Sequence, residues 1–440
     1  MKTLKVTLKQ HTPLIHFQHD QYGATLRASE VKPKLDRFIL TKQGDGNYDQ
    51  GCELARTKGW LIGDKNALNY KISIVPYERK DVLLRISERN GKFETETFPM
   101  ILSNMGGKDN REELMNLSLY NYVVATIVVM NDSLLDELRS CLPLFFATTN
   151  FGQRHTKGFG SFTVYRFNDE KSIRWNPLDY YVNGCPYMAF ALENGNSLND
   201  KQQQEKIFAV LDFYWKCLKA GVNYTKRGQF QNRYIKSFLY VFLNSLGLTW
   251  EKREIKQNFQ LGIPGTNVKE NKNLPIFARG FLGCPDKYSY GNREVKVSHN
   301  TNNEEIKIDR IPTPIYFKPV CIGNVVYVYI LFDSSVTASL IPVLKENRIF
   351  KMSYNGRSFT MDMKSFLNSK NYIDFIDDYH KYLSTNDAVA EALYADYSKE
   401  TYVDFDGENI VDDDWAFVPR DFNWRDILKD RNCVIFNNVE

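Results

Sequence analysis

The first 170 residues alternate between segments with the two-residue period of a strand and segments with the 3.6-residue period of a helix. From Thr3 to Leu8, apolar and polar residues alternate, which predicts a half-buried strand. The segment that begins at Ser29 carries an apolar stripe at helical spacing. Ser29 can cap this helix, and Pro33 is tolerated in its first turn. This alternation favours folds in which helices pack on a sheet.

Further patterns complete a regular order of elements. Two short strand patterns cover residues 70–75 and 82–86, and a Val-rich strand pattern covers 119–130. Asn131-Asp132-Ser133 then forms an N-cap signal for a helix, which a glycine-rich loop and a last strand at 161–167 follow. The order predicts an α+β fold, with a ferredoxin-like (RRM-like) βαββαβ domain in residues 1–170. In that domain two helices back a four-stranded antiparallel sheet.

The second half of the chain mixes helical and strand patterns. Helical spacing returns after Asp200 and again near 231–246, whereas 251–274 is polar and is typical of a loop or arm. A hairpin is predicted for residues 315–320 and 325–332.

These patterns predict two further regions. Residues 171–345 are expected to hold a helical insertion and a second, diverged ferredoxin-like module with helical insertions. Residues 346–440 are expected to form a helical C-terminal segment with an acidic tail around Asp404–Trp415.

Charge is distributed unevenly, although the net charge is only +4. Residues 201–300 hold 17 Lys and Arg against 7 Asp and Glu, and residues 351–440 hold 10 against 18. A basic middle suits a phosphate backbone, and an acidic end suits a basic partner subunit, although either can be a solvated surface.

Some function classes lack support in the sequence. The seven cysteines are too scattered for a zinc cluster, and nothing else indicates a metal or another cofactor. No signal peptide or membrane-spanning run is apparent, so a cytoplasmic location without a membrane partner is expected.

The segment Phe151–Phe162, FGQRHTKGFGSF, carries the most specific chemistry. Glycines let a backbone approach a phosphate closely and adopt positive φ, and exposed amides in such a turn form an anion-binding nest. Basic side chains add charge to that nest, and an aromatic ring there can stack on a base. The spacing matches neither a P-loop nor GxGxxG. The predicted RNA contacts in this loop are Gly152, Arg154, His155, Lys157, Gly158, Phe159 and Gly160.

The form G-x-R-x-x-K-G-x-G, placed between a last helix and a last strand, resembles the signature of the RAMP superfamily of CRISPR RNA-binding proteins. Thr12-Pro13-Leu14 and Arg27–Lys32 are similar to the family's opening segments. Gly280–Pro285 and Arg310–Ile315 resemble segments of the two-module subunits of the type III-B (Cmr) effector complex, most closely the Cmr-one-like subunits.

The resemblance implies a non-catalytic RNA-binding subunit of a CRISPR ribonucleoprotein in antiviral defence. Its expected partners are crRNA, near the 3′ end, target RNA and other subunits of the effector complex. The alternative is a metal-independent CRISPR RNA-processing endoribonuclease, in which His16 or His19 acts as general acid or base.

Other basic residues are candidate RNA contacts outside the loop. Four lie at or near the first predicted helix, where a solvated face is an equal alternative: Arg27, Lys32, Lys34 and Arg37. Three more, Lys226, Arg227 and Arg233, are interleaved with aromatic residues, a pattern that suits single-stranded nucleic acid but also an amphipathic helix. His16 is a further candidate contact.

Overall fold

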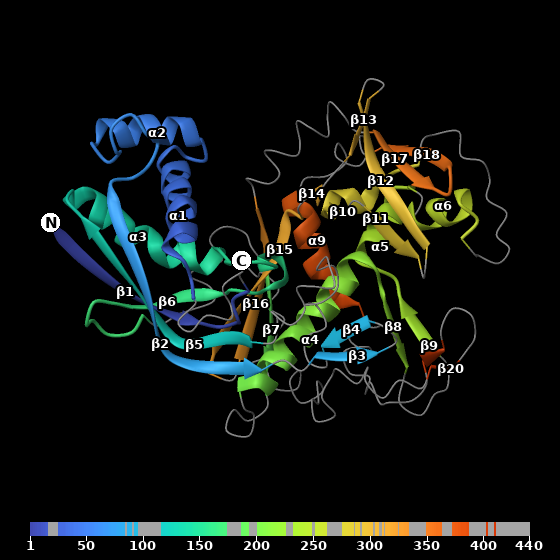
Figure 1. Ribbon diagram of the computed structural model, residues 1–440, viewed down its shortest axis with the longest axis horizontal. Coiled ribbons are helices and arrows are strands. Elements are labelled where there is room, and N and C mark those ends of the chain that lie inside the picture. Colours follow the sequence, from blue (N-terminus) through green and yellow to red (C-terminus); the bar gives the residue numbers. More distant parts are fainter. Residues whose placement is uncertain are drawn as a thin grey trace. The chain divides into compact units, whose positions relative to one another are not determined.

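The computed structural model has a mixed α and β fold, which Figure 1 shows from one side. It describes residues 1–15, 25–83, 86–89, 92–95, 116–173, 186–192, 200–225, 232–248, 251–261, 275–285, 287–290, 293–301, 304–307, 310–311, 313–323, 325–333, 349–362, 372–386, 402–403 and 409–410. Its contacts group into two compact units. The first contains Met1–Asp212 and Phe317–Tyr329, and the second contains Phe213–Tyr316 and Ile330–Val411.

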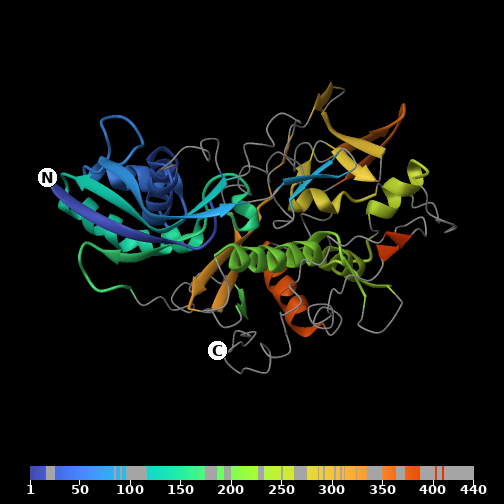
Figure 2. The same cartoon turned by 60° about the horizontal axis from the view of Figure 1, so that its bottom comes forward.

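A four-stranded sheet is the centre of the first unit. Its strands are β1 (Lys2–Gln10), β2 (Tyr70–Leu83), β5 (Asn116–Val129) and β6 (Phe162–Phe167), in the order β2-β5-β1-β6. Every neighbouring pair is antiparallel. Together with the helices α1 (Ala28–Gln43) and α3 (Asp132–Thr148), the strands follow the predicted order along the chain (Figure 2).

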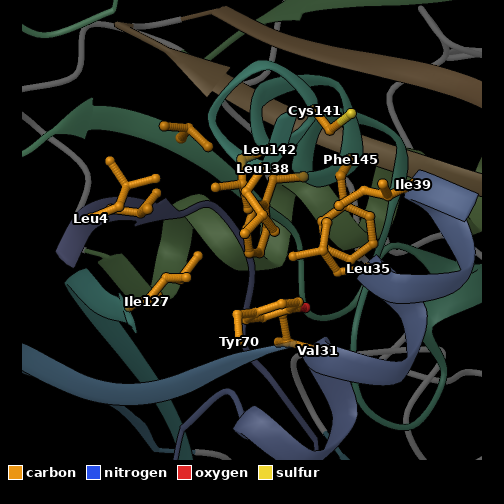
Figure 3. Packing of buried hydrophobic residues seen from close by; sticks show 14 of the residues in the cluster. Leu4, Val31, Leu35, Ile39, Tyr70, Ile127, Leu138, Cys141, Leu142 and Phe145 are labelled. Carbon is orange, nitrogen blue, oxygen red and sulfur yellow. The ribbon is translucent and has the colours of Figure 1, made fainter. Parts of the chain in front are cut away.

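Apolar side chains of the two helices and of one face of the sheet form the core of this unit. Figure 3 shows them converging, with Leu35 of α1 beside Phe145 of α3. Asn131 caps α3 as predicted, since its side chain accepts a hydrogen bond from the Leu134 amide at 3.1 Å.

The two strands predicted around Pro76 form one strand, β2. Proline lacks the amide that a ladder hydrogen bond needs, so it is tolerated on an edge strand. β2 is at the edge of the sheet, where only β5 pairs with it. The interruption predicted at Pro76 is therefore wrong.

The start of α1 also differs from the prediction. The helix begins at Ala28, Arg27 occupies the N-cap position without a side-chain cap, and Ser29 lies in the first turn. Pro33 is inside the helix, beyond the first turn. The predicted cap by Ser29 is therefore wrong.

One helix of the first unit, α2 (Tyr48–Thr57), was not predicted. Asn47 caps it by accepting hydrogen bonds from the amides of Asp49 and Gln50. Asn47 is the signal in the sequence that identifies its start.

The predicted hairpin is present as β15 (Ile315–Ile322) and β16 (Val325–Phe332), with the turn at Gly323, whose φ is 56°. β16 also pairs with β7 (Tyr187–Ala191). The predicted helix after Asp200 is α4 (Asp200–Lys219), which has Ile207, Leu211 and other predicted apolar positions buried.

The second unit departs from the predictions at three places. Residues 232–235 form the strand β9, and the helix α5 (Phe238–Ser245) begins only after Ser237, which caps it. The polar stretch from Glu251 begins with the helix α6 (Glu251–Asn258), because a buried ion pair with Arg279 compensates Glu251. Residues 349–362 form a hairpin rather than a helix.

That hairpin consists of β17 (Ile349–Tyr354) and β18 (Arg357–Asp362). It belongs to a sheet in which β11 (Lys287–Tyr290), β12 (Arg293–Thr301), β17 and β18 are neighbours in that order, and β13 (Glu304–Lys307) also pairs with β12. The other elements are β3 (Ile86–Arg89), β4 (Lys92–Thr95), η3 (His155–Lys157), β8 (Val222–Thr225), β9 (Asn232–Ile235), η5 (Ala278–Leu282), β10 (Cys284–Pro285), β14 (Arg310–Ile311), α9 (Tyr372–Thr385), β19 (Tyr402–Val403) and β20 (Asn409–Ile410).

Candidate nucleic-acid interface

The glycine-rich loop between α3 and β6 depends on left-handed backbone conformations. φ is 76° at Gly152, 54° at Arg154, 91° at Gly158 and 66° at Gly160. A Cβ at Gly160 would lie 2.0 Å from the carbonyl oxygen of Phe151, and one at Gly152 would lie 2.6 Å from that of Ile15. These positions therefore require glycine, as the sequence predicted.

The segment Thr12–Ile15 holds one side of this loop. The Thr12 hydroxyl donates to the Gly158 carbonyl at 2.7 Å and accepts from the Ser161 amide at 3.0 Å. The Gly160 amide donates to the Pro13 carbonyl at 2.8 Å. The Thr-Pro-Leu segment, recognised in the sequence only by resemblance, is thus a structural partner of the loop.

β15 holds both ends of the loop. The Lys318 ammonium donates to the carbonyls of Thr149 and Phe162, at 2.9 Å and 2.8 Å. The Asn150 amide group donates to the Phe317 carbonyl at 2.7 Å, and the Ser161 hydroxyl donates to the Pro319 carbonyl at 2.6 Å. Lys318 is fully buried, and burial lowers its pKa well below the usual lysine value.

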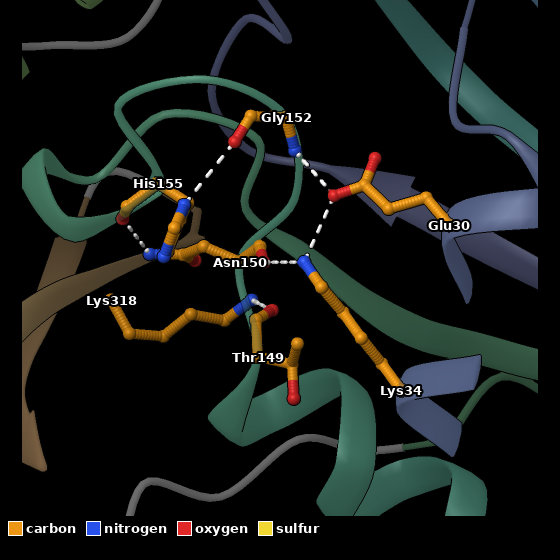
Figure 4. Close-up of polar contacts among 7 residues, drawn as sticks. All are labelled: Glu30, Lys34, Thr149, Asn150, Gly152, His155 and Lys318. Atoms are coloured by element: carbon orange, nitrogen blue, oxygen red, sulfur yellow. Dashed lines mark hydrogen bonds and ion pairs between the residues drawn. The ribbon is translucent and has the colours of Figure 1, made fainter. Parts of the chain in front are cut away.

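The chain's own carboxylate occupies part of the predicted anion nest. Glu30 Oε1 accepts from the Gly152 amide at 2.8 Å and from Lys34 Nζ at 2.9 Å (Figure 4). Lys34 also approaches the Asn150 carbonyl at 3.4 Å and the Phe151 ring at 4.9 Å from its centroid. Gly152 and Lys34 therefore stabilise the loop, and their contact with RNA stays a prediction.

Lys32 is held in a similar way within the unit. Its ammonium pairs with Asp36 at 2.7 Å, donates to the Leu68 carbonyl at 2.9 Å and lies 4.1 Å from the centroid of the Tyr70 ring. Burial is the main cause that raises the pKa of Asp36, against the opposing effect of the Lys32 hydrogen bond. Lys32 nevertheless lines an open depression of about 460 Å³, together with Ser29 and others: Ala28, Pro33, Tyr70, Lys71 and Ile72.

Phe159 does not present its ring to a base. The side chain is fully buried and stacks on Phe208 of α4, with the ring centroids 4.0 Å apart. The predicted stacking role of Phe159 is therefore wrong, because a core partner takes the position that a base would need.

Three side chains of the loop, Arg154, His155 and Lys157, are partly exposed. The His155 ring nitrogen Nδ1 lies 3.2 Å from the Gly152 carbonyl oxygen. The backbone carbonyl of His155 accepts a hydrogen bond from the Asn150 side-chain amide at 2.8 Å, so His155 orders the loop. The structure therefore brings Arg154 and Lys157 together on a backbone that several hydrogen bonds fix.

The remaining predicted contacts fall into two groups. Arg27 is partly exposed at the start of α1, and Arg37 is exposed with its guanidinium 5.3 Å from the centroid of the Tyr48 ring. Arg233 is on β9 opposite Tyr224, although its side chain is not described. His16, His19, Lys226, Arg227 and most of Asp404–Trp415 lie outside the described residues.

Sequence reasoning gave no role to the buried His11. Its Nδ1 accepts from the Cys321 amide at 3.1 Å, so in the neutral ring Nε2 donates to the Thr163 hydroxyl at 2.7 Å. Burial, with smaller effects of Lys9 and Lys318, lowers its pKa well below 6.5. The sequence does offer one sign of buried polar contacts in this region, because Lys318 lies within the otherwise apolar strand pattern of residues 315–320.

Within the described residues, no group of three or more His, Cys, Asp or Glu side chains is placed to hold a metal ion. The described part of the chain also contains no helix of the length and apolarity that crossing a bilayer requires.

Comparison with known protein families assigns both halves of the chain. The Cmr1 N-terminal domain matches residues 1–222, and the Cmr1 C-terminal domain matches residues 234–390. The chain belongs to the Cmr1 family. This result confirms the resemblance to a RAMP subunit of type III-B CRISPR systems. The part that matches the Cmr1 N-terminal domain contains both the glycine-rich loop and its partner segment Thr12–Ile15.

Several solved structures are similar to this Cmr1 family member. Cmr1 from Pyrococcus furiosus in its apo form is 12% identical, with a TM-score of 0.39, and the match covers 86% of this chain and 96% of that one. A chain of a type III-B Cmr-beta complex bound to cognate target RNA is 11% identical, with a TM-score of 0.38, covering 86% and 99%. A RAMP protein described as binding different RNA substrates is 10% identical, with a TM-score of 0.18, covering 82% and 99%. No curated protein matches the chain.

Proposed function

We propose that this chain is a non-catalytic RNA-binding subunit of a type III CRISPR effector ribonucleoprotein, which acts in antiviral defence in the cytoplasm. In this proposal it contacts crRNA near the 3′ end, target RNA, or both, and it binds other subunits of the complex. The observation that carries the proposal is the glycine-rich loop of a Cmr1 N-terminal domain, which presents Arg154 and Lys157 on a fixed backbone.

Arg154 and Lys157 are the main phosphate contacts in this proposal, and His155 supports them. Charged side chains bind single-stranded RNA most strongly where their backbone does not have to be ordered on binding, and the loop meets that condition. Arg27 and Arg37 of the α1 region add positive charge within the same unit. Arg233, Lys226, Arg227 and His16 remain predicted contacts.

The proposal includes the finer description of the fold. The strand order β2-β5-β1-β6, with α1 and α3 packed on one face, supports a ferredoxin-like domain. A second, diverged ferredoxin-like module and the divisions near residues 170 and 345 stay predictions, which limited proteolysis of the full chain can test.

The double variant Arg154→Ala/Lys157→Ala tests the RNA site by fluorescence anisotropy with single-stranded RNA. Each lost contact is expected to weaken binding by about 1.5–3 kcal/mol at most, and by less because the side chains are partly exposed. The slope of log K against log salt should flatten by about 0.7 per contact. Arg56→Ala/Lys58→Ala on α2 is the matched control for lost charge, and unchanged affinity and slope in the loop variant would refute the site.

The nuclease alternative is tested separately. The purified chain is incubated with a hairpin repeat RNA in EDTA, and the expected result is intact RNA. A unique product that disappears in His16→Ala or His19→Ala would replace the proposal with the endoribonuclease.

A further inference from the structure

The four-stranded sheet has a second face, on the side away from α1 and α3. Side chains of a strand alternate between the two faces, and along β5 the residues Val123, Ala125 and Ile127 are buried beneath the helices. The residues between and beside them, Tyr122, Val124, Thr126 and Val128, are partly exposed. We call the side that carries them the open face.

Three tyrosines form a row across the open face. Tyr77 of β2 is directly opposite Tyr122 of β5 in the strand register, so both side chains point to the same side. Tyr165 lies on β6 where the pairing of β6 with β1 shifts register, so no residue of β1 is directly opposite it. The centroid of the Tyr165 ring is 5.0 Å from that of the Tyr122 ring. Since β1 lies between β5 and β6, these two rings meet above β1, where Thr7 is only 8% exposed.

The end of the row at β2 is open to solvent. Tyr77 is 53% exposed, and Val75, the next residue on the same face of β2, is 52% exposed. Few large apolar side chains of the described residues are exposed to this extent. Tyr77 therefore offers an aromatic face, next to Tyr122 in the strand register, that packing within the unit leaves in water.

The charge around the row is positive. Lys5 and Lys71 are exposed on the open face, Arg166 is exposed opposite Thr7, and Lys9 lies opposite Tyr122. No carboxylate belongs to the open face within Thr3–Lys9, Lys71–Tyr77, Tyr122–Val128 and Thr163–Arg166. Glu78, which follows on β2, accepts a hydrogen bond from Asn121 at 2.7 Å.

The geometry points to a base-stacking site for single-stranded RNA on the open face, with Tyr77, Tyr122 and Tyr165 as the platform. Every base has a flat face that stacks on an aromatic ring, and the flanking cations suit the phosphates between stacked bases. This inference rests on the proposed RNA-binding function and adds a second contact, distinct from the glycine-rich loop. A protein partner is disfavoured as occupant, because the four cations around the row outnumber the Glu78 carboxylate beside Tyr77 and Tyr122.

Tyr77→Ala tests the site, with the full chain and a short single-stranded RNA in fluorescence anisotropy. Loss of one stacked base should weaken binding roughly 5- to 150-fold, whereas Tyr77→Phe should stay within about threefold because the ring is kept. The salt slope should not change, since no phosphate contact is lost. Leu54→Ala on α2, where Leu54 is 39% exposed, is the control for removal of exposed apolar surface.

The same site is tested without changing the protein. RNA with abasic positions should bind the wild-type chain more weakly than intact RNA, and this difference should shrink in Tyr77→Ala. If the wild-type chain does not bind RNA at all, the proposed function fails and the stacking site with it. If the wild-type chain binds RNA and Tyr77→Ala binds it equally well, only the stacking site is overturned, and the row is then a surface for a protein subunit.

Discussion

At the scale of single residues, Glu30 sets the charge of the glycine-rich loop. Its carboxylate accepts from the Gly152 amide and pairs with Lys34, so it places a negative charge where the proposed function needs a positive one. Glu30→Gln keeps an oxygen that can accept from Gly152 but removes the charge and the pairing with Lys34.

We therefore expect Glu30→Gln to bind single-stranded RNA more tightly, by roughly 2- to 5-fold at low salt. Its free energy of unfolding should change by less than about 1 kcal/mol, because the Lys34–Glu30 pair is partly exposed. Anisotropy and chemical denaturation measure the two effects. Glu53→Gln, which breaks the exposed Arg56–Glu53 pair on α2, is the control, and an equal or lower affinity of Glu30→Gln would contradict this role of Glu30.

Residue-scale chemistry was only partly predictable from the sequence. The need for glycine at Gly152, Gly158 and Gly160 was predicted, because positive φ is a local property. The packing of Phe159 on Phe208 was not, because it depends on tertiary structure, whereas the pairing of Lys34 with Glu30 is an i,i+4 contact within α1 that the sequence could have shown. A basic or aromatic residue beside a loop has the same letter in the sequence whether it faces solvent or the core.

At the scale of elements, the loop between α3 and β6 is a rigid structure that close backbone approach holds in place. Gly160→Ala combines positive φ with a Cβ 2.0 Å from a backbone oxygen, so it should lower the free energy of unfolding by about 3 kcal/mol or more. Gly46→Ala is the matched control. It also has positive φ, 94°, but no atom lies within 4 Å of its Cβ, so a loss of about 1–2 kcal/mol is expected. Denaturation curves measure both, and equal losses would show that the close approach does not matter.

The elements of the first unit were predictable where a local signal marks them. Asn131 marked the start of α3, and the alternation of Thr3–Leu8 marked β1. The course of β2 through Pro76 was not predictable, because only the sheet order shows that this strand is at an edge. In the second unit, α6 was missed because the ion pair that allows Glu251 to be buried involves a residue 28 positions away.

At the scale of the whole molecule, the loop depends on residues far along the chain. Lys318 and Phe317 bind Thr149 and Asn150 at one end of the loop, and they are more than 160 positions away in the sequence. The part that matches the Cmr1 N-terminal domain ends at residue 222, before β15 begins. The N-terminal domain alone therefore lacks one of the segments that hold its loop.

This dependence predicts how a fragment of residues 1–222 behaves toward trypsin, which cuts after Arg and Lys. In the full chain, Lys157 lies in the short 3-10 turn η3 and Arg154 directly precedes it. Hydrogen bonds from flanking residues to Pro13, Phe317 and Pro319 hold both sides of the loop, so cleavage there should be slow. In the fragment, the Asn150 amide and the Ser161 hydroxyl lose their β15 partners, and cleavage after Arg154 or Lys157 should become fast. Mass spectrometry of timed digests identifies the sites. Lys58 at the end of α2, whose described contacts lie within residues 1–222, is the internal control, since its cleavage rate should be the same in both proteins. Equal protection of the loop in the fragment would show that Thr12–Ile15 and α1 fix it without β15, and that β15 has no part in forming the proposed RNA site.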